Sequence, residues 1–93
     1  MLLSPINARR WRRYRVNLPV RIIVRIGAEC VSLSGRGTDL GRGGMMLHAE
    51  VSLEPGDRIE VDFQTPSQLQ VAGTIRNQLG HRFGVEFVTP LQS

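Results

Sequence analysis

The chain has 93 residues, of which 41% are hydrophobic, and this size and composition predict one small globular domain with a single modest core. A single cysteine excludes an internal disulfide framework, and no apolar run is long enough to cross a bilayer, so we expect a soluble, cytoplasmic protein. All 12 basic residues are arginine: residues 1–28 carry seven of them and no acid, whereas the remainder carries five arginines and all 8 acidic residues. This asymmetry predicts an anionic partner for the N-terminal segment.

The N-terminal segment concentrates its arginines in one run, Ala8-Arg-Arg-Trp-Arg-Arg-Tyr-Arg15. Because like charges repel, we expect residues 1–17 to form a flexible basic arm, followed by a β-domain over residues 18–93. Arginine favours planar, bidentate contacts with phosphates and guanine edges. The run alone leaves three interpretations open: a solvated tail, a grip on nucleic acid, or one half of a site that is completed elsewhere in the chain.

The domain after the arm shows the two-residue period of half-buried strands. Apolar and polar residues alternate in five runs, which lie at Val20–Ile26, Glu29–Leu33, Ile59–Phe63, Leu69–Ile75 and Phe83–Phe87. In the first run the alternation places Ile26 on the core side. Turns are predicted at Gly27-Ala28, at Pro55-Gly56 and around Gly80. Short alternating strands with regular turns, and no helical periodicity, predict an antiparallel barrel or sandwich.

A glycine-rich stretch, Gly35-Arg-Gly-Thr-Asp-Leu-Gly-Arg-Gly-Gly-Met45, lies in the middle of the chain. It is not a Walker-type phosphate loop, which requires lysine, and it breaks the dinucleotide pattern G-x-G-x-x-G because Leu40 stands where the third glycine belongs. Taken alone, the stretch favours a bulged hairpin turn in which Asp39 caps a backbone N–H.

Two motifs at this separation carry a resemblance to a known family. Arg9-Arg-Trp-Arg-Arg13 fits R-x-x-x-R, and Asp39-Leu-Gly-Arg-Gly-Gly44 fits the frame [D/N]-x-S-x-x-G with glycine at the serine position. Together with the strand pattern, they make the chain resemble the PilZ domain, the bacterial receptor module for cyclic di-GMP, from about Arg9 to Val88. The resemblance implies an all-β fold, a six-stranded antiparallel β-barrel, with the nucleotide bound on its outside.

The resemblance also implies roles for individual residues. Arg9 and Arg13, helped by Arg10, would hold the phosphates and the Hoogsteen edges of the guanines. Asp39 would accept hydrogen bonds from guanine N1–H and N2–H2, and Gly44 would keep the backbone clear of the base. These roles match the chemistry of the ligand, because arginine pairs with phosphate, stacks on bases and binds guanine O6 and N7.

The chain departs from the family pattern in two places. Gly41 replaces the motif serine, so one hydroxyl contact is missing, which costs about 0.5–1.5 kcal/mol of binding free energy. Restoring serine is therefore expected to tighten binding, unless Gly41 has a backbone reason to be glycine. Only residues 89–93 follow the last strand, so little or no C-terminal helix is expected. Arg42 lies inside the motif as a further ligand contact or a solvated turn residue, and Arg76 is a lesser candidate for the same face.

Three functional classes remain open. The first is a cyclic di-GMP receptor whose arginine arm becomes ordered on binding and signals to an unidentified effector protein. The second is a degenerate relative that serves as a protein-interaction adaptor in motility or pilus machinery, which Gly41 favours. The third is a small nucleic-acid-binding barrel, which the acidic body disfavours. We expect no enzyme, because paired carboxylates, a metal cluster and a nucleophile–base pair are missing, and no metal, further cofactor or membrane insertion.

Overall fold

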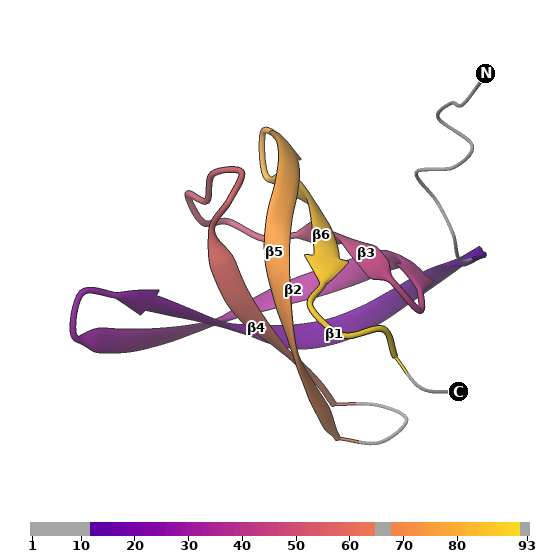
Figure 1. Ribbon diagram of the computed structural model, residues 1–93, viewed down its shortest axis with the longest axis horizontal. Helices are drawn as coiled ribbons and strands as arrows, with labels where there is room; N and C mark the ends of the chain where they lie inside the picture. The colour runs from indigo at the N-terminus through magenta and orange to yellow at the C-terminus, as the bar shows by residue number, and fades with distance from the viewer. Residues whose placement is uncertain (1–11, 65–67, 92–93) are drawn as a thin grey trace.

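The computed structural model describes residues 12–64 and 68–91, which form an all-β domain (Figure 1). Its six strands are β1 (Arg13–Ile26), β2 (Glu29–Gly41), β3 (Gly44–His48), β4 (Arg58–Phe63), β5 (Leu69–Leu79) and β6 (Arg82–Phe87). They form a closed barrel in the order β1-β2-β3-β6-β5-β4, in which every neighbouring pair is antiparallel. The predicted six-stranded antiparallel barrel is confirmed, and the described residues contain no helix that could cross a membrane.

The turns follow the local chemistry that the sequence indicates. Gly27 has a φ of 64° and occupies the first central position of the two-residue β1–β2 turn, where the primed hairpin turns require positive φ. Gly56 has a φ of 98°, as the second central residue of a type II turn does. That turn is closed by the N–H of Asp57, which donates to the carbonyl of Glu54 at 3.0 Å.

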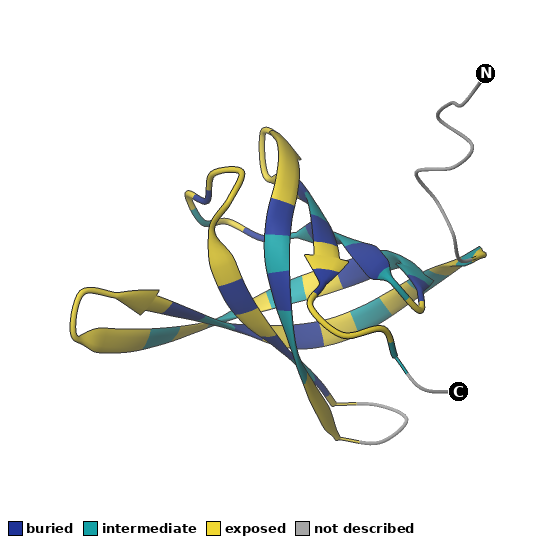
Figure 2. Ribbon diagram, viewed as in Figure 1, coloured by how far each residue is buried: buried dark blue, intermediate teal, exposed yellow. Residues whose placement is uncertain are grey.

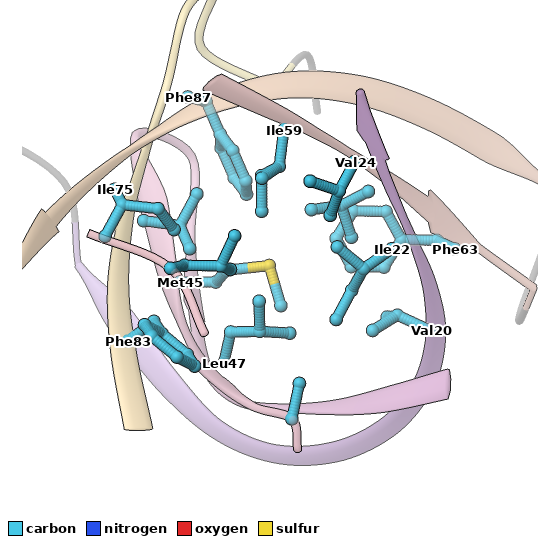
Figure 3. Close-up of a cluster of buried hydrophobic side chains, with 14 residues drawn as sticks. Val20, Ile22, Val24, Met45, Leu47, Ile59, Phe63, Ile75, Phe83 and Phe87 are labelled. Carbon is cyan, nitrogen blue, oxygen red and sulfur yellow. The ribbon is translucent and has the colours of Figure 1, made fainter. Parts of the chain in front are cut away.

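One core fills the barrel, and alternate residues of the strands supply it (Figure 3). Met45 and Leu47 of β3 and Phe83 of β6 are completely buried. The other buried hydrophobic residues are Val20, Ile22, Val24, Ala49, Leu53, Ile59, Val61, Phe63, Ile75, Val85 and Phe87. No polar or charged residue of the described chain is buried. The outer wall of the barrel therefore carries all the described groups that could recognise a ligand.

The first two strands are longer than the barrel is tall, so their hairpin projects beyond it (Figure 1). Strand β4 pairs with β1 only from Val20 to Val24, and nothing in the described chain continues that pairing. Ile26 was expected on the core side, but it is 61% exposed, and the hairpin tip is exposed as a whole (Figure 2). The alternation places Ile26 on the core-side face of the hairpin, but the residue lies past the point at which the barrel ends, so no core covers it.

The glycine-rich stretch forms strand rather than a turn over most of its length. Strand β2 continues to Gly41, and the chain reverses only at residues 42–43 before β3 begins at Gly44. A bulge does occur, since the pairing of β2 with β3 shifts register between Gly37 and Asp39. The second motif therefore lies partly on a barrel strand and partly on the turn that follows it.

Candidate functional site

The end of the β1–β2 ribbon opposite the projecting hairpin brings Arg13, the last residue of the first motif, beside the second motif. Arg13 pairs with Gly41, and Arg15 pairs with Asp39, at the start of β1 and the end of β2. Leu40 between them packs against the core, so the alternation of the strand directs Asp39 and Gly41 to the outside of the barrel. The second arginine of R-x-x-x-R therefore lies on the same outer face as the residues of the second motif.

Part of the segment expected to be an arm belongs to the barrel. Strand β1 begins at Arg13, and its pairing with β2 shifts register between Arg15 and Leu18. Asn17 lies in this irregularity and accepts a hydrogen bond from Nη1 of Arg36 at 2.9 Å. Arg9, Arg10 and Trp11 lie outside the described residues.

Gly41 lies beside the start of β1, where it pairs with Arg13. A methyl group on Gly41 would lie 2.8 Å from the carbonyl oxygen of Arg12 and 3.2 Å from Cγ of Arg13. The φ of Gly41 is outside the left-handed range, so the backbone conformation itself does not demand glycine. The reason for glycine is space, because the backbone of Arg12, just before β1, occupies the volume that a side chain would need.

Gly44 is enclosed as well, at the start of β3. A Cβ there would collide with the carbonyl oxygen of Val85 on β6, and it would lie 3.2 Å from Nη2 of Arg13. The side chain of Arg13 thus passes Gly41 with its Cγ and reaches Gly44 with its guanidinium. One arginine spans two of the three glycines of the second motif, Gly41 and Gly44. Together with Asp39 these residues form what we call the candidate site: Arg13, Asp39, Gly41 and Gly44.

A charged pair borders the candidate site on β5 and β6. Glu86 pairs with Gly44 in the β3–β6 register, and its carboxylate forms an ion pair with Nε of Arg76 at 3.0 Å. Both side chains are well exposed, at 63% for Arg76 and 59% for Glu86. Arg76 had been a lesser candidate for this face, whereas Glu86 had not been singled out. Only the register of β3 against β6 reveals its position, and no local sequence pattern encodes that register.

Arg42 connects the turn after β2 to the C-terminal segment. Its Nε donates to the carbonyl of Leu91 at 2.9 Å, and the N–H of Leu91 donates back to the carbonyl of Arg42 at 2.7 Å. A third hydrogen bond joins the same turn to the end of β6: the carbonyl of Gly43 accepts from the N–H of Phe87 at 2.8 Å. The residues after β6 therefore lie against the turn of the second motif, a structural role for Arg42 that the sequence did not predict.

The remaining polar candidates do not join the candidate site. His48 lies at the far end of β3 from Gly44, and Cys30 is exposed near the tip of the projecting hairpin. No group of three or more histidine, cysteine, aspartate or glutamate residues within 12–64 and 68–91 could hold a metal ion. The chemistry available on this face is that of guanidinium and carboxylate groups, which suits an anionic ligand that also offers hydrogen-bond donors.

Comparisons with known proteins agree with the fold. The family model for the PilZ domain matches residues 7–93, whereas no curated protein matches the chain. Among solved structures, the PilZ domain of CeSA from a cellulose-synthesizing bacterium superposes with a TM-score of 0.66 at 16% identity, covering 83% of this chain and 80% of that one. YcgR from Escherichia coli, solved in complex with c-di-GMP, superposes with a TM-score of 0.64 at 22% identity. That match covers 86% of this chain and 38% of YcgR.

Proposed function

This chain belongs to the PilZ domain family, and on that basis we propose that it is a receptor domain for cyclic di-GMP. The observation that carries the proposal is the position of Arg13, which spans Gly41 and Gly44 on the outer face that also holds Asp39. The similarity in fold to YcgR, which was solved with c-di-GMP bound, supports the same ligand.

The proposed binding mode assigns one chemical role to each group. Arg13, with Arg9 and Arg10 from the preceding segment, binds the phosphates and the O6 and N7 acceptors of guanine. The ionised carboxylate of Asp39 accepts two hydrogen bonds from the Watson–Crick edge of guanine. Glycine at position 44 avoids the collision that a Cβ would make with the carbonyl oxygen of Val85, and it adds no side chain beside the Arg13 guanidinium, where the base binds.

The proposal includes a change of order in the arm. Residues 1–12 carry three arginines, which repel one another until the ligand's phosphates supply partners for them. The arm then closes over the nucleotide, and a partner protein recognises the closed state. Ordering this segment lowers the net affinity, because part of the binding free energy offsets the lost conformational entropy. The domain acts by binding and carries out no catalysis.

One observation favours the alternative, a PilZ-type interaction adaptor that does not bind the nucleotide. The volume that the motif serine would occupy at position 41 is filled by the carbonyl oxygen of Arg12. The hydroxyl contact is therefore missing, and the chain itself takes up part of the space beside it.

Isothermal titration calorimetry tests the proposal against both alternatives. The protein is titrated with cyclic di-GMP, with GMP and with a short single-stranded DNA. We expect saturable heat with cyclic di-GMP at physiological salt and much weaker heat with GMP, which lacks the second guanine and the bridging phosphate. Absence of cyclic di-GMP binding would favour the adaptor. DNA binding that weakens steeply with salt would favour the nucleic-acid barrel.

A further inference from the structure

The projecting β1–β2 hairpin has one open edge. Strand β2 pairs with β1 along its whole length, but β3 joins its other side only from Arg36, which pairs with His48. Within the described chain, the β2 segment Glu29–Gly35 has no strand on that side, and the hairpin stands clear of the other strands (Figure 1).

This edge lacks the devices by which proteins usually protect edge strands. Its sequence, Glu-Cys-Val-Ser-Leu-Ser-Gly, contains no proline or basic residue, and its only charge is Glu29 beside the turn. The core-side face of the hairpin carries apolar residues that the barrel does not cover: Ile26 is 61% exposed and Val31 is half-buried. From neighbouring β1, Nε of Arg21 donates to Oγ of Ser32 at 3.0 Å on the polar face of the ribbon. An edge whose own charge is confined to the turn, beside an uncovered apolar face, is a surface suited to pairing with another strand.

The β1–β2 turn determines which backbone groups face outwards. In a two-residue hairpin the residues that flank the turn form a hydrogen-bonded pair, and the direction of the amides then alternates along the strand. Ile26 and Glu29 flank the turn, so the amides of Cys30, Ser32 and Ser34 are directed to the open edge. The next residue in this series, Arg36, is the one that pairs with β3.

The types of side chain in the open segment follow the same order in both directions from Ser32. From Cys30 to Ser34 the order is small, apolar, small, apolar, small. Antiparallel pairing with a second copy, centred on Ser32, places Val31 opposite Leu33 and Cys30 opposite Ser34. This centring also places Glu29 opposite Gly35, so that two copies use the whole open segment and stop short of Arg36, where β3 begins.

We propose that two copies of this chain associate by antiparallel pairing of their β2 edges about Ser32. The pairing joins the two ribbons into one four-stranded sheet and forms about six hydrogen bonds between the copies. It places the apolar pairs of Val31 and Leu33 on one face and the small polar pairs on the other. The candidate site lies at the opposite end of the ribbon, so the association does not depend on the nucleotide.

An interface of one strand from each copy is small, below the roughly 1,200 Å² at which stable protein pairs begin, so the dimer depends on concentration. Sedimentation velocity over a wide range of protein concentration is therefore the first measurement. We expect the sedimentation coefficient to rise towards that of a dimer. Ser32→Pro removes the central outward N–H, leaves the pairing with β1 in place, and is expected to sediment as a monomer at every concentration.

Cysteine cross-linking tests the register itself. Directly opposed residues of a hydrogen-bonded pair lie about 5.5 Å apart at Cα, within the range of a disulfide. Cys30→Ser/Ser32→Cys should therefore form a disulfide-linked dimer on mild oxidation. The matched control, Cys30→Ser/Ser34→Cys, should not, because its two thiols are separated by four positions along the ladder, about 13 Å. A monomer at all concentrations, or equal cross-linking of both variants, overturns the proposal.

Discussion

Arg13 is the first residue of β1, and its guanidinium lies next to Gly44, the first residue of β3. A methyl group on Gly44 would be 3.2 Å from Nη2 of Arg13, and one on Gly41 would be 3.2 Å from Cγ of the same arginine. The pairing of Arg13 with Gly41 fixes its backbone in β1, and its side chain extends from there across the second motif. This preorganisation reduces the entropy that the side chain loses when a ligand binds.

Arg13→Ala is expected to remove most of the binding of cyclic di-GMP and to leave the barrel folded, because the side chain lies on the outer wall. Hydrogen bonds to a charged group contribute about 1.5–3 kcal/mol, so the dissociation constant measured by calorimetry should rise by about 10-fold to 150-fold. Arg25→Ala, an exposed arginine near the far end of the same strand, is the control and should bind as the wild type does. Equal affinities of the two variants would remove Arg13 from the site.

Gly41→Ser and Gly41→Ala separate two effects at the motif position. The sequence alone predicts that serine tightens binding, whereas the structure adds a cost, since any Cβ meets the carbonyl oxygen of Arg12 at 2.8 Å. Both variants should lower the melting temperature, and neither should bind better than the wild type. If the hydroxyl still contacts the ligand, serine should bind up to about tenfold more tightly than alanine. Tighter binding by Gly41→Ser than by the wild type would contradict this expectation and show that the start of β1 moves aside at no cost.

Glu86→Gln tests the charged border of the site. The substitution removes a negative charge beside Gly44 and releases Arg76 from its ion pair. Exposed ion pairs contribute about 0–1 kcal/mol, so stability should hardly change, while cyclic di-GMP should bind up to about fivefold more tightly at low salt. Glu60→Gln on β4 is the control, since its carboxylate is engaged with Gln70 elsewhere on the barrel. No difference between the two variants would place Glu86 outside the reach of the ligand.

The fluorescence of Trp11, the only tryptophan, tests the closing of the arm. Cyclic di-GMP should change its emission saturably and raise its anisotropy by more than the added mass explains. Single-stranded DNA at physiological salt should have no such effect. A flat tryptophan signal together with calorimetric binding would mean that the arm is not the clamp. A response to DNA alone would identify the nucleic-acid barrel.

Ile75→Val probes the packing of the core from β5. Ile75 is completely buried, and removing one methyl group from such a position costs about 0.5–1.5 kcal/mol of unfolding free energy. For a domain of this size, the melting temperature should fall by several degrees, about 4–8 °C for each kcal/mol. Leu79→Ala on the same strand removes more atoms but should have little effect, because Leu79 is 75% exposed. A larger loss for Leu79→Ala would mean that this exposed end of β5 is covered in solution.

The sequence predicted the features that alternation and turn chemistry encode. The strands around Val61 and Val85 and the turns at Gly27 and Gly56 are confirmed. Alternation alone left a barrel or a sandwich open, and the six-stranded barrel that the resemblance to the PilZ domain implied is confirmed as well. Ile26 is exposed although alternation assigns it to the core-side face, because alternation continues along a strand whether or not a core lies opposite. Taken alone, the glycine-rich stretch favoured a bulged hairpin turn, whereas most of it is strand. Its glycines are needed because other parts of the chain approach them closely, as at Gly37, Gly41 and Gly44.

The features that sequence reasoning missed depend on register between distant segments. The contact of Arg13 with Gly44, the place of Glu86 beside the site and the bonds from Arg42 to Leu91 join residues that no local pattern relates. Register follows from how the whole barrel closes, so these contacts become visible only in three dimensions.

The closure of the barrel has a consequence for the rate at which the chain folds. The seam is made by β1 and β4, whose pairing joins Val20 to Phe63, and a second non-local seam joins Gly44 of β3 to Glu86 of β6. Neither seam can form until the long intervening loops have been closed, and barrels dominated by such contacts fold in milliseconds to seconds. The β1–β2 hairpin is different, because its two-residue turn brings its strands together locally and within microseconds. An early intermediate with this hairpin formed would expose the open β2 edge before the rest of the barrel exists. At high concentration, folding chains would then associate first through their hairpins.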